Sequence, residues 1–201
     1  MMASVMYYKN LKFELDPEVY EPHDDTFLIL DNLNWYLSKD LSVLDMGTGI
    51  GIIAIVAALK SKEVLGVDIN EKAVNLAKKN AKLNQISNVR FRISNLFSNI
   101  SNLEQFDLII FNPPYLPVED SSILGTAWSG GENGIKVVIK FLRDVKRHLR
   151  NGGKILLLLS SLSDLHSFHE FLTRHGYFHK IIARKKLFFE ELFLYELTTS
   201  P

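Results

Sequence analysis

The chain has 201 residues with 23 basic and 23 acidic side chains, so its net charge is zero. This length suits one domain over residues 1–201 with a substantial buried core. The balanced charge gives no overall attraction to nucleic acid, and the lack of cysteine excludes disulfides and cysteine-ligated zinc. The longest apolar runs, 52–59 and 155–159, are too short to cross a bilayer, and residues 1–9 show no secretion-signal pattern. We therefore expect a cytoplasmic protein that is not embedded in a membrane.

Residues 1–40 are expected to form an N-terminal segment in which the stretch 20–26 precedes a helix over 26–37. Apolar residues recur in this helix at helical spacing: Phe27, Leu30, Leu33 and Leu37. Two interpretations stay open at this point. Asp24 and Asp25 suit an acidic helix start, or the segment forms a lid over a bound ligand.

A glycine-rich turn follows a predicted strand over 42–46 and opens a predicted helix over 50–60. Its glycines alternate: Gly47, Gly49 and Gly51. A dinucleotide site would need a further glycine where Ile52 stands. The alternating pattern instead lets the backbone pass close under a nucleoside with an amino-acid tail, and Asp45 can receive the ammonium group of that tail.

The next predicted strand, 63–67, ends in Asp68. This acid lies roughly 20 residues after the glycines, where an acid meets a ribose diol in doubly wound folds. A helix over 71–84 and a strand over 89–94 follow. Together with the glycine turn, Asp68 predicts a nucleoside-binding site at the carboxyl ends of these strands.

The most specific motif is Asn112-Pro113-Pro114-Tyr115, which follows a predicted buried strand over 107–111. The two prolines stiffen the backbone as it leaves the strand. The side-chain carbonyl of Asn112 and the backbone carbonyl of Pro113 can accept both hydrogens of a planar NH2 group, and Tyr115 offers a flat face. The alternative is a plain Pro-Pro turn with a core tyrosine, which the upstream motifs disfavour.

The remaining chain predicts helices over 134–149 and 164–174 and a strand over 154–160. Two further strands, 177–184 and 187–197, are separated only by Lys185-Lys186 and should form an antiparallel hairpin. Strands and helices alternate throughout, which indicates a doubly wound α/β sheet.

Four histidines are interpreted as part of a surface helix and turn rather than as a zinc site: His166, His169, His175 and His179. Four basic residues, Arg143, Lys146, Arg147 and Arg150, are read as solubilising, or else as a contact for RNA or an acidic partner.

These motifs together resemble the HemK-like glutamine methyltransferases of translation termination factors, and most closely their eukaryotic and archaeal branch. The resemblance runs through nearly the whole chain. Five stretches support it: 20–27, 45–51, 94–97, 112–115 and 128–134. The fold implied is the seven-stranded, Rossmann-like class I methyltransferase fold with an antiparallel C-terminal hairpin. The cofactor implied is S-adenosyl-L-methionine, and no metal is expected.

The resemblance implies N5-methylation of the glutamine in the Gly-Gly-Gln loop of a class 1 release factor. The implied cofactor-binding residues are Thr26, Asp45, Gly47, Gly49, Gly51, Asp68, Asn95, Leu96 and Asn112, and the implied catalytic residues are Asn112, Pro113 and Tyr115. Asn95 departs from the family, which usually has an acid facing the adenine amino group. The branch also works with a small zinc-binding activator protein, expected to dock on the strand 89–93. The alternative is N6-adenine or N2-guanine methylation of RNA or DNA, which the zero net charge disfavours.

Overall fold

The computed structural model describes residues 4–114 and 134–200, which divide between two compact units, Met1–Ile100 and Ser101–Pro201. The expectation of a single domain over the whole chain stays a prediction. The elements of the first unit are β1 (Val5–Tyr8), β2 (Leu11–Glu14), α1 (Asp24–Leu33), the 3-10 turn η1 (Asn34–Tyr36), β3 (Ser42–Met46), α2 (Ile52–Ala58), β4 (Glu63–Asp68), α3 (Glu71–Leu83) and β5 (Val89–Ile93).

The elements of the second unit are β6 (Phe106–Phe111), α4 (Lys136–Asp144), the 3-10 turn η3 (Val145–Arg147), β7 (Leu149–Ser160), α5 (Leu165–Arg174), β8 (Phe178–Lys186) and β9 (Glu191–Thr198). Its core combines strand residues such as Ile109 and Leu157 with aromatic side chains of the helices, Phe141 and Phe168, all fully buried. Within the described residues no helix is long and apolar enough to cross a membrane.

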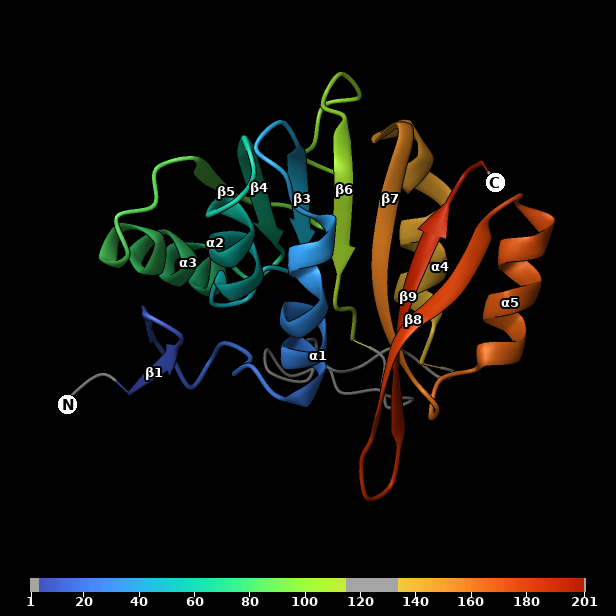
Figure 1. Ribbon diagram of the computed structural model, residues 1–201, viewed down its shortest axis with the longest axis horizontal. Helices are drawn as coiled ribbons and strands as arrows, with labels where there is room; N and C mark the ends of the chain where they lie inside the picture. The colour runs from blue at the N-terminus through green and yellow to red at the C-terminus, as the bar shows by residue number, and fades with distance from the viewer. Residues whose placement is uncertain (1–3, 115–133, 201) are drawn as a thin grey trace. The chain divides into compact units, whose positions relative to one another are not determined.

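Seven strands form one sheet in the order β5-β4-β3-β6-β7-β9-β8 (Figure 1). Strands β3, β4 and β5 pair in parallel, as do β6 and β7, whereas β9 runs antiparallel to both β7 and β8. This arrangement confirms the predicted doubly wound, Rossmann-like sheet with an antiparallel hairpin at its C-terminal end.

Local chemistry explains strand β3 and helices α2 and α3 of the first unit. Strand β3 is buried along its whole length, as expected for a parallel strand covered on both sides. Helix α2 begins after Gly51, whose backbone is left-handed. Helix α3 begins at a true cap, because the Asn70 side chain accepts a hydrogen bond from the backbone of Lys72. Its apolar face is built from small residues, Ala73, Val74, Ala77 and Ala81.

The structure adds an N-terminal hairpin, β1–β2, that the sequence patterns did not predict. Helix α3 holds this hairpin through two buried or half-buried amides one turn apart. Asn84 accepts from the backbone of Lys12 and donates to its carbonyl, at 2.9 and 2.7 Å. Asn80 does the same for Glu14, at 2.8 and 3.1 Å. The two amides therefore act like a neighbouring strand for the free edge of β2.

Three predicted boundaries of the second unit are wrong. Strand β7 begins at Leu149 rather than 154, with a register shift opposite Phe106 and Leu108. The hairpin turn is 187–190, not Lys185-Lys186, because Lys185 and Lys186 pair with Leu192 and Glu191 inside the β-ladder. The predicted helix over 134–149 is shorter and ends in the 3-10 turn η3.

Candidate active site

The glycine turn between β3 and α2 has three glycines with left-handed backbones, Gly47, Gly49 and Gly51. Only glycine adopts such angles without strain, which explains the alternating pattern. A Cβ added at Gly51 would lie 2.9 Å from the Cβ of Ala77, so this glycine lets α3 pack closely. A Cβ at Gly49 would meet nothing nearer than the Tyr20 carbonyl at 3.9 Å. Within the described residues, the backbone at Gly49 is therefore not closely covered.

Asp45 lies under this turn and is fully buried. Its Oδ2 accepts hydrogen bonds from the Thr48 hydroxyl at 2.6 Å and the Ala54 amide at 3.1 Å. Its Oδ1 is buried and has no hydrogen-bond partner within the described residues. Burial, with a smaller contribution from the nearby Asp68, raises the pKa of Asp45 to about 7. Oδ1 is thus the one part of this carboxylate open to a new donor.

Asp68 ends β4 beside the same turn. Its Oδ2 accepts from the Gly49 amide and its Oδ1 from the Asn70 amide, both at 2.9 Å. Each carboxylate oxygen has a second lone pair, so Asp68 can still accept from two hydroxyl groups. Burial raises the pKa of Asp68 above its usual range. A hydrogen-bond donating ligand at this position would therefore stabilise its ionised form.

The loop after β5 contains the predicted residues Asn95 and Leu96. The Ser94 amide donates to the Asp68 carbonyl at 2.8 Å, which places the start of this loop next to the end of β4. The buried Ser94 hydroxyl donates to the Leu96 carbonyl at 2.6 Å and holds Leu96 in a left-handed backbone, with φ at 50°. A non-glycine residue in this conformation is uncommon and is favoured near binding sites. The Asn95 side chain is exposed.

The N-terminal segment passes over the glycine turn. Its Glu18 carbonyl accepts from the Asn70 side chain at 3.1 Å, and the Tyr20 carbonyl faces Gly49. The Tyr20 hydroxyl donates to the buried Asp25 at 2.8 Å, and Asp25 accepts from the Thr26 amide. Thr26, a predicted cofactor contact, is 4% exposed at the start of α1. Asp25 therefore helps to order this segment, while His23 before it makes no side-chain cap.

Asn80 connects the segment to the glycine turn. It is fully buried, and besides holding Glu14 it donates to the Ile50 carbonyl at 2.9 Å. One side chain of α3 therefore fixes both the strand β2 and the turn that carries Gly49 and Gly51. Sequence patterns did not reveal this role, because Asn80 and its two partners, Glu14 and Ile50, are far apart along the chain.

The charges of this unit suit a cationic nucleoside. Asp45 and Asp68 repel one another, and neither forms an ion pair with any residue in 4–114 or 134–200. A ligand with an ammonium group, a positive centre and two hydroxyls would satisfy the buried Oδ1 of Asp45 and the spare lone pairs of Asp68. S-adenosyl-L-methionine has these groups, so the residues present fit it.

The second unit holds the predicted residue Asn112, directly after β6. The Asn112 Oδ1 is shielded from solvent, and Pro113 is buried. The two carbonyl groups predicted to accept from a planar NH2 group thus follow directly after β6, and their role stays a prediction. Tyr115 and the stretch 128–133 lie outside the described residues, so their predicted roles stay predictions.

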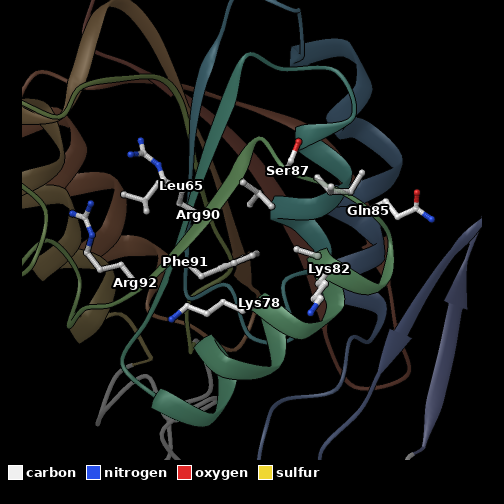
Figure 2. A pocket seen from close by; sticks show the side chains of 11 residues that line it. Leu65, Lys78, Lys82, Gln85, Ser87, Arg90, Phe91 and Arg92 are labelled. Carbon is white, nitrogen blue, oxygen red and sulfur yellow. The ribbon is translucent and has the colours of Figure 1, made fainter.

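A groove of about 700 Å³ lies at the exposed edge of β5 in the first unit. Its floor is apolar, with Leu65, Val89 and the half-buried ring of Phe91. Figure 2 shows its basic side chains: Lys78 and Lys82 from α3, Arg90 and Arg92 from β5. A Cβ added at Gly66 would lie 2.6 Å from the Phe91 ring, so this ring fits against the glycine of β4.

The histidines form aromatic contacts. His169 and His179 stack with ring centroids 5.0 Å apart, and the Tyr195 hydroxyl lies 3.3 Å from His169 Nε2. His175 stacks on Phe171 at 3.8 Å. In the described part of the chain no group of three or more histidine, aspartate or glutamate side chains could hold a metal ion.

Comparisons with known proteins agree with this chemistry. The model of the methyltransferase small domain family matches residues 23–188. A putative protein N5-glutamine methyltransferase of Methanocaldococcus jannaschii is 42% identical over 193 residues, which cover 94% of this chain and 95% of that protein. A release factor glutamine methyltransferase of Aliivibrio fischeri is 33% identical over 84% of this chain, but this match spans only 63% of that longer protein.

Among solved structures, the E. cuniculi Mtq2–Trm112 complex, which methylates the eRF1 translation termination factor, superposes with a TM-score of 0.73. The match covers 91% of this chain and 99% of that chain at 23% sequence identity. At this identity the likeness shows a shared fold.

Proposed function

Since the chain belongs to the methyltransferase small domain family, we propose that it transfers a methyl group to the side-chain amide of a glutamine in a class 1 release factor. The observation that carries the proposal is the pair of carbonyl acceptors at Asn112 and Pro113, directly after β6. The 42% identical relative named for protein N5-glutamine methylation supports it. Such a reaction belongs in the cytoplasm, where termination factors act.

The cofactor of the proposal is S-adenosyl-L-methionine, which supplies an electrophilic methyl group on a sulfonium. Asp68 would accept from its ribose hydroxyls, and the Oδ1 of Asp45 would accept from its ammonium group. Gly47, Gly49 and Gly51 would let the backbone lie close beneath it, with Thr26, Asn95 and Leu96 at the margins. The two carboxylates described above support these roles, because buried acids favour a cation.

The residues Asn112 and Pro113 would orient the substrate. An amide nitrogen is a poor nucleophile because its lone pair is conjugated, so the reaction depends on alignment. Two acceptors that hold both N–H bonds leave the lone pair directed at the methyl carbon, and orientation of this kind supplies on the order of 7–11 kcal/mol. Asn112 has no useful basicity, so the proton lost from nitrogen passes to water.

Nucleic acid is the alternative substrate, since an exocyclic base amine is also a planar NH2 group. The basic residues near η3 do not favour it. Arg150 is bound to Asp107 at 2.6 Å and Arg147 to Asp144 at 3.5 Å. Lys146 donates to the His175 carbonyl and lies 4.3 Å from the Tyr177 ring. Basic side chains that already pair with groups of the protein are less available to replace the counterions of a nucleic acid backbone.

We also propose a small zinc-binding activator protein as a partner on the edge of β5. Strand β5 is the outermost strand at its end of the sheet, and another chain can bind such an edge by adding a strand. The groove beside it supports the proposal, because an apolar floor with a basic rim suits a partner with apolar and acidic side chains. The partner would have to hold zinc itself, because this chain has no cysteine.

Co-expression with the activator should give a one-to-one complex with higher solubility and activity. Ile93→Asp, on β5, should abolish the complex, whereas Trp35→Ser, at an exposed position away from the edge, should not. Arg92→Pro should abolish it too, but Arg92 pairs with Val67 in the ladder between β4 and β5, so the proline also weakens the sheet itself. Phe91→Asp should also abolish it, but it removes the ring that packs on Gly66 and so disturbs the unit itself. An isolated chain that is fully active and ignores the activator would contradict this part of the proposal.

The function is tested by incubating the complex with labelled cofactor and either a class 1 release factor or bulk RNA. We expect label in the protein and none in the RNA. Label in the RNA alone would overturn the proposed substrate and leave the methyltransferase activity intact.

A further inference from the structure

The turn between β8 and β9 exposes two aromatic rings. Phe188 is 91% exposed and Phe189 is 84% exposed, and their ring centroids lie 4.5 Å apart in an edge-to-face arrangement. Exposed phenylalanines that contact each other form an apolar surface of a kind that often binds another protein. We call Phe188 and Phe189 the hairpin tip.

The hairpin tip is held rigidly. The Leu187 amide donates to the Glu190 carbonyl at 2.8 Å, and Glu190 accepts from the Ser160 hydroxyl at the end of β7. Ser161 and Glu191 exchange two more hydrogen bonds, at 2.8 and 2.9 Å. A rigid turn loses little conformational entropy when it binds a partner, which favours a role in recognition.

The sheet places the tip on the reactive side of the second unit. Phe111, at the end of β6, pairs with Leu157 of β7, and Ser160, three residues further along β7, pairs with Leu192 of β9. The hairpin therefore extends beyond the end of β7, on the same side of the sheet at which β6 ends and Asn112 follows (Figure 1). At about 3.3 Å per residue and about 4.8 Å between strands, the tip lies about 20 Å from Asn112.

We propose that the hairpin tip docks the polypeptide that presents the target glutamine, an inference that rests on the proposed function. A small substrate could not span this distance. An extended polypeptide advances about 3.3 Å per residue, so a segment about six residues from the glutamine would reach the tip. Strand β8 carries Arg184, Lys185 and Lys186 up to the turn, so the matching surface on the substrate is apolar with acidic neighbours.

The test compares the Phe188→Ser/Phe189→Ser double variant with the wild type on two substrates. One is the intact class 1 release factor, and the other is a peptide with about three residues on each side of the glutamine, too short to reach the tip. For the double variant we expect the KM for the release factor to rise at least about tenfold with little change in kcat. Its kinetics with the short peptide should match the wild type.

A matched control is Leu103→Ser. Leu103 is 92% exposed in the same unit but precedes β6, at the end of the strand away from Asn112. It should leave both substrates unaffected, and all three proteins should bind S-adenosylhomocysteine equally.

Unchanged KM for the release factor in the double variant overturns the inference, as does an equal loss with the short peptide. Loss of RNA binding with intact release-factor methylation would assign the tip to nucleic acid instead and also overturn it. A wild-type chain that, together with its activator, methylates neither glutamine substrate refutes the proposed function, a result that the variants cannot produce.

Discussion

Asp45→Asn should stabilise the protein at neutral pH in the absence of cofactor, although it removes a predicted binding residue. An asparagine resembles the protonated carboxyl group: its oxygen can accept from Thr48 and Ala54, and no charge is buried. The wild-type carboxyl group is fully buried, and its pKa is raised from 3.8 to about 7. That rise corresponds to about 4 kcal/mol at most, because each pH unit is worth 1.36 kcal/mol.

The sign of the pH dependence follows from the raised pKa. The native state holds the Asp45 proton more tightly than the unfolded state, so the stability from this proton is fully present below the unfolded pKa of 3.8. It is lost as the pH rises to about 7 and stays lost above that value. The advantage of Asp45→Asn over the wild type should therefore grow by about 3 kcal/mol between about pH 5 and about pH 8.

Urea titrations at several pH values measure the free energy of unfolding of both proteins. A difference between them that grows with pH and then levels off near pH 7 supports the buried carboxyl group as described. Two curves that stay parallel over this range would refute it.

Cofactor binding should reverse the balance at Asp45. An ammonium group at Oδ1 favours the ionised carboxylate, so binding of S-adenosylhomocysteine at about pH 6 should release a proton. Calorimetry in two buffers with different ionisation enthalpies detects this proton. Asp45→Asn should release none and bind about tenfold to a hundredfold more weakly. If the wild type and Asp45→Asn bind S-adenosylhomocysteine equally and the wild type releases no proton, Asp45 only shapes the turn and does not bind the ammonium group.

Three further substitutions separate binding, catalysis and structure. Asn112→Ala should lower turnover at least about a hundredfold, because the substrate amide loses an acceptor, while the Kd for S-adenosylhomocysteine should change little. Near-normal turnover would show that Asn112 does not orient the substrate. Asp68→Ala should weaken S-adenosylhomocysteine by roughly 1.5–3 kcal/mol in calorimetry, and an unchanged Kd would place the ribose elsewhere. Asn80→Leu should cost about 3–5 kcal/mol in urea unfolding, since Glu14 and Ile50 lose their buried partners. A cost below about 1 kcal/mol would show that these groups find other partners.

The sequence predicted the glycine turn, Asp68 and the end of β6 because each lies where a regular strand meets a residue with special backbone or hydrogen-bonding chemistry. These signals are local. The alternation of strands and helices likewise predicted the sheet and its C-terminal hairpin, both of which the structure confirms.

Features that depend on distant residues could not be predicted. The hairpin β1–β2 is held by Asn80 and Asn84, 66 and 72 residues further along the chain. The packing of Phe91 on Gly66 depends on the register between β4 and β5. Lys185-Lys186 resembles a polar turn, but cross-strand pairing with β9 keeps both residues in β8 and moves the turn to the hairpin tip.

The roles of Ser94 and Thr48 at the candidate site could not be predicted from the sequence either. Each is a small hydroxyl residue whose importance lies in one buried hydrogen bond, Ser94 to the Leu96 carbonyl and Thr48 to Asp45. Serine and threonine are common in turns, so neither residue stands out in the sequence. The candidate site residues predicted from the sequence are those with unusual spacing, and the residues that position them became apparent only from the structure.

The most direct test of the central claim is to locate the transferred methyl group. The release factor is incubated with the chain, its activator and S-adenosyl-L-methionine, then digested and fragmented in a mass spectrometer. We expect a single methyl group on the side-chain amide of the glutamine in the Gly-Gly-Gln loop, and none when the enzyme is Asn112→Ala. A methyl group on a carboxylate, a lysine or the backbone, or an unmodified glutamine beside methylated RNA, would contradict the assignment.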